Sequence, residues 1–161
     1  MLKNIDYRLN ADVLYALRAM GHGDTLVISD TNFPADQVSR STIIGDLLRM
    51  ENLTAAQAAN AVLSVFPLDT FVNDFAMRME IVDDPETIPQ VQTEVQHEIN
   101  QAEGGERLMV GVERFRFSDL ARQSYATIQT GETRFYGCFI FRKGVIPPKD
   151  GSIPSQVPEA P

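Results

Sequence analysis

Residues 19–35 read AMGHGDTLVISDTNFPA, and this stretch decides how the chain is expected to fold. A helix-like apolar segment ends at Gly21, an apolar run follows at 25–30, and the chain turns after Asp30. Nearly continuous apolar runs of this length are typical of strands covered on both faces. One of only two histidines in the chain, His22, lies between two glycines at the first of these corners.

Helix and strand patterns alternate along the rest of the chain. Helices are expected at 11–20, 55–66, 91–103 and 117–126, with a short helical turn at 34–38. Strands are expected at 25–30, 75–82, 108–113, 126–131 and 136–146, whereas 42–48 fits either a strand or a helix start. The expected N-caps are Asn10, Thr54 and Ser118. This alternation predicts the α/β class, as a layered αβα sandwich with a largely parallel central sheet.

Length and proline distribution divide the chain into one domain and a tail. The 161 residues are enough for a single domain, which we expect to span residues 1–146. Residues 147–161 hold five prolines and no apolar period. We expect this tail to be extended and to become ordered only by docking on a neighbour.

Charge and hydropathy exclude several classes of partner. The net charge is -8 at pH 7, which argues against nucleic acid because phosphate binding needs clustered Lys and Arg. No apolar run approaches the ~20 residues of a membrane span. The N-terminal MLKNIDYRLN lacks the apolar core of a signal peptide, so we expect a cytoplasmic protein.

The chain also lacks the usual motifs for cofactors and metals. One cysteine and two histidines cannot supply a zinc site of the common N/S kind. No G-x-G-x-x-G, Walker or G-x-S-x-G motif is found. A carboxylate magnesium site stays open, although no D-x-D-x-D-G loop is present. We therefore expect chemistry without a bound cofactor or a covalent serine intermediate.

His22 is the first candidate for chemistry, because an imidazole exchanges protons near neutral pH. Its glycine neighbours leave the ring uncrowded. From position alone, the alternative is a helix C-cap, in which Gly21 ends the preceding helix and the histidine interacts with its dipole. His97 is expected to be a surface residue on a polar helix.

Other candidates follow the expected strands, where open α/β sheets collect ligands. Asp30 could bind sugar hydroxyls or act as a base, or it could only hydrogen-bond its own turn. Arg114 could bind a ligand or form a structural ion pair. Tyr136, expected with Gly137 at the start of the last strand, could stack on a sugar or simply pack. Cys138 is expected to be buried as a small apolar residue.

Four segments together resemble the family of L-fucose mutarotase and D-ribose pyranase. They are MLKNID at the start, LRAMGHGDTLVISDTNFPA, VERFRFSDLARQSYATIQTGE, and RFYGCFIFRKGVI near the end. The fucose mutarotase branch is the more similar, judged by N-F-P-A and E-R-F-x-F. The resemblance implies a cytoplasmic, cofactor-independent enzyme that interconverts the anomers of a free sugar, and ring-shaped oligomers, often decamers.

The resemblance also implies roles for individual residues. These are His22 as the proton donor, and Asp30, Arg114, Tyr136, Gly137 and Cys138 as substrate-binding residues. The family pattern Tyr-Gly-Asn ends here in Cys138, whose thiol is a weak donor. The family pattern F-Y-E-R is replaced by residues 117–120, which read FSDL. Both departures bear on which sugar is preferred more than on the reaction type.

Anomer exchange suits these residues, because ring opening takes a proton from the anomeric hydroxyl and delivers one to the ring oxygen. The alternative function is a non-catalytic sugar-binding or regulatory protein on the same scaffold, and a third is a structural subunit without a ligand.

Spacing also bears on assembly. Eight residues of extended chain at ~3.3 Å each could separate His22 from Asp30 by up to roughly 26 Å, too far for one monosaccharide. Either the chain bends back or His22 of one subunit meets Asp30 of its neighbour, and we favour the second, which predicts a homo-oligomer with sites between subunits.

Overall fold

The computed structural model describes residues 1–148, and the expected alternation of helices and strands is present in it. The helices are α1 (Ala11–Ala19), α2 (Ala35–Ser39), α3 (Ala55–Leu63), α4 (Gln90–Glu103) and α5 (Arg114–Arg122). The strands are β1 (Thr25–Ser29), β2 (Leu47–Met50), β3 (Ala76–Met79), β4 (Val110–Val112), β5 (Ala126–Thr130) and β6 (Phe139–Arg142). The expected tail falls almost wholly outside the described residues.

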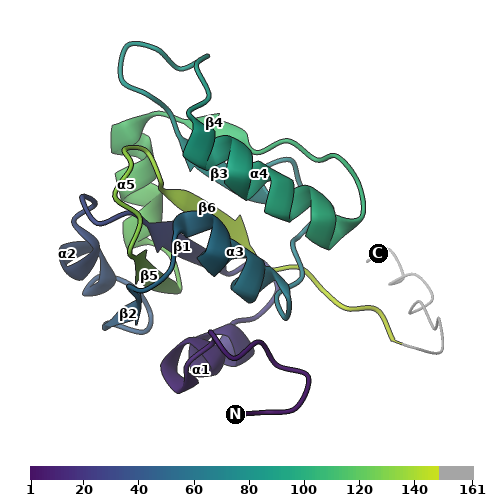
Figure 1. Ribbon diagram of the computed structural model, residues 1–161. Coiled ribbons are helices and arrows are strands. Elements are labelled where there is room, and N and C mark those ends of the chain that lie inside the picture. Colours follow the sequence, from purple (N-terminus) through teal and green to yellow (C-terminus); the bar gives the residue numbers. More distant parts are fainter. Residues whose placement is uncertain (149–161) are drawn as a thin grey trace, which may run out of the picture.

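The six strands form one sheet in the order β2-β5-β1-β6-β3-β4 (Figure 1). Neighbouring strands are parallel except where β6 is involved, since β6 runs antiparallel to both β1 and β3. The expectation of a largely parallel sheet is therefore confirmed. Strands β5 and β6 follow each other in the chain, but β1 lies between them in the sheet.

Apolar side chains are buried on both faces of the sheet, as the apolar run at 25–30 predicted. Leu26 and Ile28 of β1 belong to the core under α1, α3 and α4, whereas Val27 belongs to the core under α2 and α5. All three side chains are fully buried. Each such burial stabilises the fold by about 1.5–3 kcal/mol. The predicted αβα sandwich is confirmed.

Helix α3 shows how local chemistry sets a boundary. The hydroxyl of Thr54 accepts a hydrogen bond from Gln57 N at 3.2 Å, and the Gln57 side chain accepts one from Thr54 N at 3.0 Å. This capping box satisfies donors that the first helical turn leaves free. Buried alanines along α3 then allow close packing against α4, and the two helices lie side by side in Figure 1.

The start of α5 corrects one expectation. The helix begins at Arg114, not near residue 117, and its N-cap is Glu113 instead of Ser118. The Glu113 carboxylate accepts hydrogen bonds from the backbone N–H groups of Phe115 and Arg116, which also lowers its pKa. Ser118 lies inside the helix and donates to the carbonyl of Arg114 at 3.1 Å.

Several strands are also shorter than the sequence predicted. The ambiguous segment 42–48 is mostly irregular chain with bends, and β2 begins only at Leu47. Tyr136 and Gly137 precede the last strand, which starts at Phe139. Tyr136 has a φ of 63°, and this left-handed conformation cannot continue an extended strand.

Candidate active site

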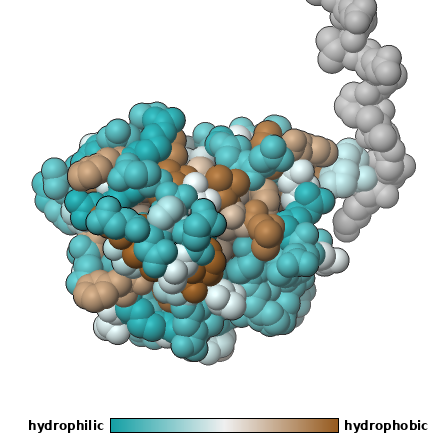
Figure 2. Space-filling model, turned by 90° about the horizontal axis from the view of Figure 1, so that it is seen from above, coloured by the Kyte–Doolittle hydropathy of each residue, from teal (hydrophilic) through white to brown (hydrophobic). Residues whose placement is uncertain are grey.

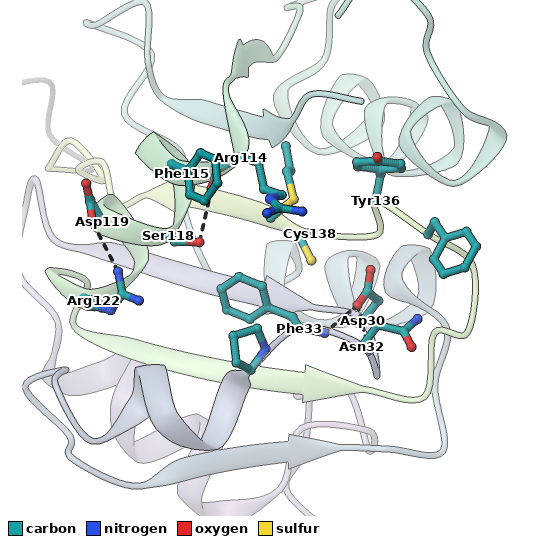
Figure 3. A pocket seen from close by; sticks show the side chains of 13 residues that line it. Asp30, Asn32, Phe33, Arg114, Phe115, Ser118, Asp119, Arg122, Tyr136 and Cys138 are labelled. Atoms are coloured by element: carbon teal, nitrogen blue, oxygen red, sulfur yellow. Dashed lines mark hydrogen bonds and ion pairs between the residues drawn. The ribbon is translucent and has the colours of Figure 1, made fainter. Parts of the chain in front are cut away.

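A cavity of about 800 Å³ opens at the edge of the sheet where β1, β3 and β4 end and β6 begins. Four of the predicted site residues line it, namely Asp30, Arg114, Tyr136 and Cys138 (Figure 3). The carboxyl ends of parallel strands meet at this edge, which is where open α/β sheets bind ligands. The structure thus gathers predicted site residues from three distant parts of the chain around one cavity.

Asp30 is the most firmly fixed of these residues. Only 4% of its surface is exposed, and its Oδ1 accepts hydrogen bonds from the backbone N–H groups of Asn32 and Phe33, both at 2.9 Å. The turn interaction considered from the sequence is therefore present. In addition, Oδ2 accepts a hydrogen bond from Gly137 N at 3.1 Å. A carboxylate has about four lone-pair sites, so one is left to accept from a ligand hydroxyl.

Tyr136 is held by its backbone as well as its ring. The side-chain amide of the buried Gln92 donates to the Tyr136 carbonyl at 3.0 Å and to the Met79 carbonyl at 2.7 Å. The phenolic oxygen accepts a hydrogen bond from Val82 N at 3.3 Å. Sequence analysis missed Gln92, although an amide in the apolar stripe of a polar helix is a signal that could have found it.

Arg114 is exposed and its guanidinium lies 4.7 Å from the centre of the Phe115 ring. In Figure 3 the side chain points towards the space beside Cys138. Among residues 1–148 the guanidinium has no carboxylate partner, so the structural ion pair considered from the sequence is absent from this part of the chain. The side chain is available to contact a ligand in the cavity.

Cys138 is buried, as expected, with 1% of its surface exposed. Burial raises the pKa of its thiol well above the usual value, and the neighbouring Asp30 carboxylate adds to this shift. The thiol therefore stays protonated at neutral pH and presents a small, weakly polar wall to the cavity.

Glu132 is a buried carboxylate that sequence analysis missed, although it ends the quoted segment at 112–132. Its side chain accepts hydrogen bonds from Arg134 Nε at 2.8 Å and from Ala55 N at 3.3 Å. The Arg134 guanidinium also binds Glu94 through two oxygens. Hydrogen bonding from Arg134 lowers the pKa of Glu132 to about 2. This network fixes the loop that carries Tyr136 and Gly137.

His22 lies apart from the cavity. It precedes β1, whereas Asp30 follows it, and the strand between them is continuous. The chain therefore does not bend back to bring the two together, and His22 does not line the cavity. It is not a helix cap either, because α1 ends at Ala19 with Met20 as its C-cap.

The partner of His22 is Asp69, a residue that sequence analysis missed. His22 Nε2 and Asp69 Oδ2 lie 3.0 Å apart, and the histidine side chain is half exposed. Asp69 is 4% exposed, and its Oδ1 has no hydrogen-bond partner among residues 1–148. A carboxylate that holds one ring nitrogen orients the imidazole and selects its tautomer. His97, as expected, is exposed on α4.

Large apolar side chains are exposed near both sets of residues. Phe115 and Phe135 line the cavity yet are 68% and 74% exposed, and Phe71, two residues from Asp69, is 79% exposed. Figure 2 looks down on the edge of the molecule that carries β4 and shows further apolar side chains gathered among hydrophilic ones. Exposed apolar groups at this density are typical of surfaces that contact other chains.

Within residues 1–148, no group of three or more His, Cys, Asp or Glu side chains is placed to hold a metal ion. No helix in this part of the chain is long and apolar enough to cross a membrane.

Comparison with known proteins defines the class. Residues 3–146 match the model of the RbsD / FucU transport protein family, so the chain belongs to that family. The fucose mutarotase of Homo sapiens is 39% identical over 147 residues, which cover 90% of this chain and 94% of that protein. The fucose mutarotase of Bos taurus is 37% identical over 153 residues, covering 93% of this chain and 97% of that protein.

The solved structures agree with this assignment. The crystal structure of a fucose mutarotase from Streptococcus pneumoniae in complex with L-fucose has a TM-score of 0.80 and 28% identity, with 90% of this chain and 99% of that chain covered. The resemblance to the fucose mutarotase branch is thereby supported by sequence and by fold.

Proposed function

We propose that this protein interconverts the anomers of a free, fucose-like monosaccharide by acid/base ring opening and reclosure. The observation that carries the proposal is the cavity that brings Asp30, Arg114 and Tyr136 together in a chain of the mutarotase family. The two anomers differ only in configuration at one carbon, so the reaction needs proton transfer but no change of oxidation level.

His22 is proposed to deliver a proton to the ring oxygen as the ring opens. Asp69 holds His22 Nε2, so in the protonated ring the other nitrogen, Nδ1, faces the sugar and carries the proton that is delivered. Opening also requires loss of the proton on the anomeric hydroxyl, and Asp30 or a water molecule accepts it. Reclosure on the other face of the carbonyl reverses both transfers. A positioned acid–base group of this kind contributes ~10²–10⁴-fold to the rate.

The cavity residues are proposed to hold the sugar during these transfers. Asp30 accepts a hydroxyl hydrogen bond through its remaining lone pair, and Arg114 donates to ring or hydroxyl oxygens. Tyr136 offers its ring face and its hydroxyl. Gly137 acts through its backbone N–H, which orients the Asp30 carboxylate. Cys138 forms the floor beside them.

The active site is proposed to be shared between subunits. His22 and the Asp30 cavity lie at opposite ends of β1, so one chain supplies only part of a site. Exposed phenylalanines accompany both parts, Phe71 near Asp69 and Phe115 at the cavity, as expected if these surfaces meet in an oligomer. A closed head-to-tail ring, a decamer by family resemblance, would complete every site equally. A cytoplasmic location stays a prediction.

Exchange spectroscopy tests the reaction directly. Saturation-transfer NMR on L-fucose, D-ribose and D-galactose should show accelerated exchange between the anomeric signals, fastest for the fucose-like sugar. His22→Asn should lower the rate by ~10²-fold or more. His97→Asn, a matched change on an exposed helix face, should leave it unchanged. Sugar binding without faster exchange in the wild-type protein would favour the non-catalytic sugar-binding function instead.

A further inference from the structure

The end of β6 makes close contacts with the turn that carries His22. Gly23 N donates a hydrogen bond to the Lys143 carbonyl, and Lys143 N donates one to the Asp24 carbonyl, each at 2.8 Å. The turn is also closed within itself, because Gly21 N donates to Asp24 Oδ2 at 2.7 Å. With a φ of 86° at Gly23, the backbone has the left-handed residue that a type II turn needs. Lys143 thus pairs with this turn through its backbone.

The same short segment pairs on its other side with the chain around Asp69. Asp69 N donates to the Arg142 carbonyl at 3.0 Å, and Gly144 N donates to the Pro67 carbonyl at 2.8 Å. Leu68 and Lys143 form an isolated antiparallel bridge. Residues 142–144 therefore lie between the chain segments that carry the two members of the His22–Asp69 pair.

The side chain of Lys143 makes a third set of contacts. Its ammonium donates to the carbonyls of Leu17 and Met20, both at 2.6 Å, where α1 ends. A cation is stabilised at a helix C-terminus, where carbonyl groups have no partner in the helix. The Phe66 ring centre lies 5.9 Å from the ammonium. The contacts fix the direction in which the chain leaves α1, one residue before the His22 turn begins.

We propose that Lys143 is a positioning residue that holds the His22 turn beside Asp69, and so sets the orientation of the imidazole. It acts through the end of α1 and through the backbone pairing on both of its sides, and it does not line the cavity. The inference rests on the proposed function in one respect, because the consequence for rate assumes that His22 transfers the proton. The effect on the His22 ring does not depend on that assumption.

The test uses the two histidines as internal probes. Lys143→Met keeps the length of the side chain but removes the donors to Leu17 and Met20. In the ¹⁵N-labelled full-length protein at fixed pH, the imidazole signals of His22 should shift or broaden, whereas those of His97 stay in place. The kcat for anomer exchange should fall by about 10- to 100-fold with little change in KM, as expected when a reacting group is misplaced.

Two further variants sharpen the result. Lys143→Arg, which keeps a cation at the end of α1, should restore much of the wild-type rate and spectrum. Lys3→Met, a matched change at an exposed lysine, should alter neither. Where Lys143→Met fails to fold, Lys143→Gln, which removes the charge but keeps an NH₂ donor group on a shorter side chain, takes its place. An unshifted His22 spectrum in a folded variant would overturn the proposal. A shifted spectrum in Lys143→Met, together with no exchange activity in the wild-type protein, would overturn the proposed function but support the positioning role.

Discussion

Gly137 N donates a hydrogen bond to Asp30 Oδ2 at 3.1 Å, and this contact joins residues 107 positions apart in the chain. It links the turn after β1 to the loop before β6. Because Gly137 precedes Cys138 and follows Tyr136, the contact places these two cavity residues close to the Asp30 carboxylate. The rigidity of the site therefore depends on this hydrogen bond, which joins the turn after β1 to the loop before β6.

Gly137→Ala tests the junction. A Cβ at this position would lie 2.8 Å from Glu132 Cγ and 3.3 Å from Asp30 Cβ, so the loop or the carboxylate must move. We expect weaker sugar binding, seen as a KM for exchange raised by about tenfold, the equivalent of roughly 1.4 kcal/mol. Gly105→Ala is the control, because a Cβ there meets nothing within 4 Å. An unchanged KM in Gly137→Ala would show that the junction does not position the sugar.

The buried Glu132 pair should matter for stability. Glu132→Ala leaves Arg134 N and Ala55 N without their acceptor and removes one of the two carboxylates bound by the guanidinium. We expect a loss of about 2–3 kcal/mol in the free energy of unfolding, measured with urea, since Arg134 is partly exposed and can recover some hydration. Asp36→Ala, which breaks an exposed pair, should cost less than about 1 kcal/mol.

The pH dependence of stability follows from the same carboxylate. The pKa of Glu132 is lowered in the folded protein from 4.5 to about 2 by its hydrogen bond with Arg134. Its contribution is thus complete above pH 4.5 and is lost as the pH falls from 4.5 towards 2. In urea titrations across this window, Glu132→Gln should show a flatter decline than wild type. Part of the decline in stability at low pH should remain in Glu132→Gln, because Arg8 lowers the pKa of Asp6 to about 2 as well. Identical slopes would contradict the assignment.

Burial of Cys138 predicts an unreactive thiol. Because burial raises its pKa, the thiolate is scarce at pH 8. Labelling by a thiol reagent in the folded protein should be more than about 100-fold slower than in the urea-unfolded chain, since it must await local opening. Rapid labelling of the folded protein would mean that the floor of the cavity opens readily.

Much of the fold could be predicted because its signals are local. The apolar run at 25–30 and the side chains of Asn10 and Thr54 act within a few residues of the elements that they define. The predicted start of α5 was wrong because Ser118 is a preferred N-cap residue type and Glu113 is not, yet the Glu113 carboxylate accepts the hydrogen bonds of the first turn. The left-handed backbone conformation of Tyr136 likewise depends on a hydrogen bond from the side chain of Gln92, 44 residues away.

The residues of the candidate site also divide into those with a local signal in the sequence and those that depend on distant parts of the chain. Asp30 and Arg114 could be placed together from the sequence, because each follows a strand whose carboxyl end meets the same edge. Asp69 could not be found in this way, because its pairing with His22 spans 47 residues. The pair forms only because the chain at the end of β6 lies between the two loops and aligns them. Glu132 was missed because a charged residue after a strand normally indicates an exposed turn.

Subunit complementation tests the central claim most directly, that one site combines His22 of one chain with Asp30 of another. His22→Asn and Asp30→Asn should each be nearly inactive alone. Unfolded together in equal amounts and reassembled, they should recover about one quarter of the wild-type anomer exchange rate, because one in four random interfaces pairs an intact His22 with an intact Asp30. Mixed oligomers that form but stay as inactive as the separate variants would contradict the account.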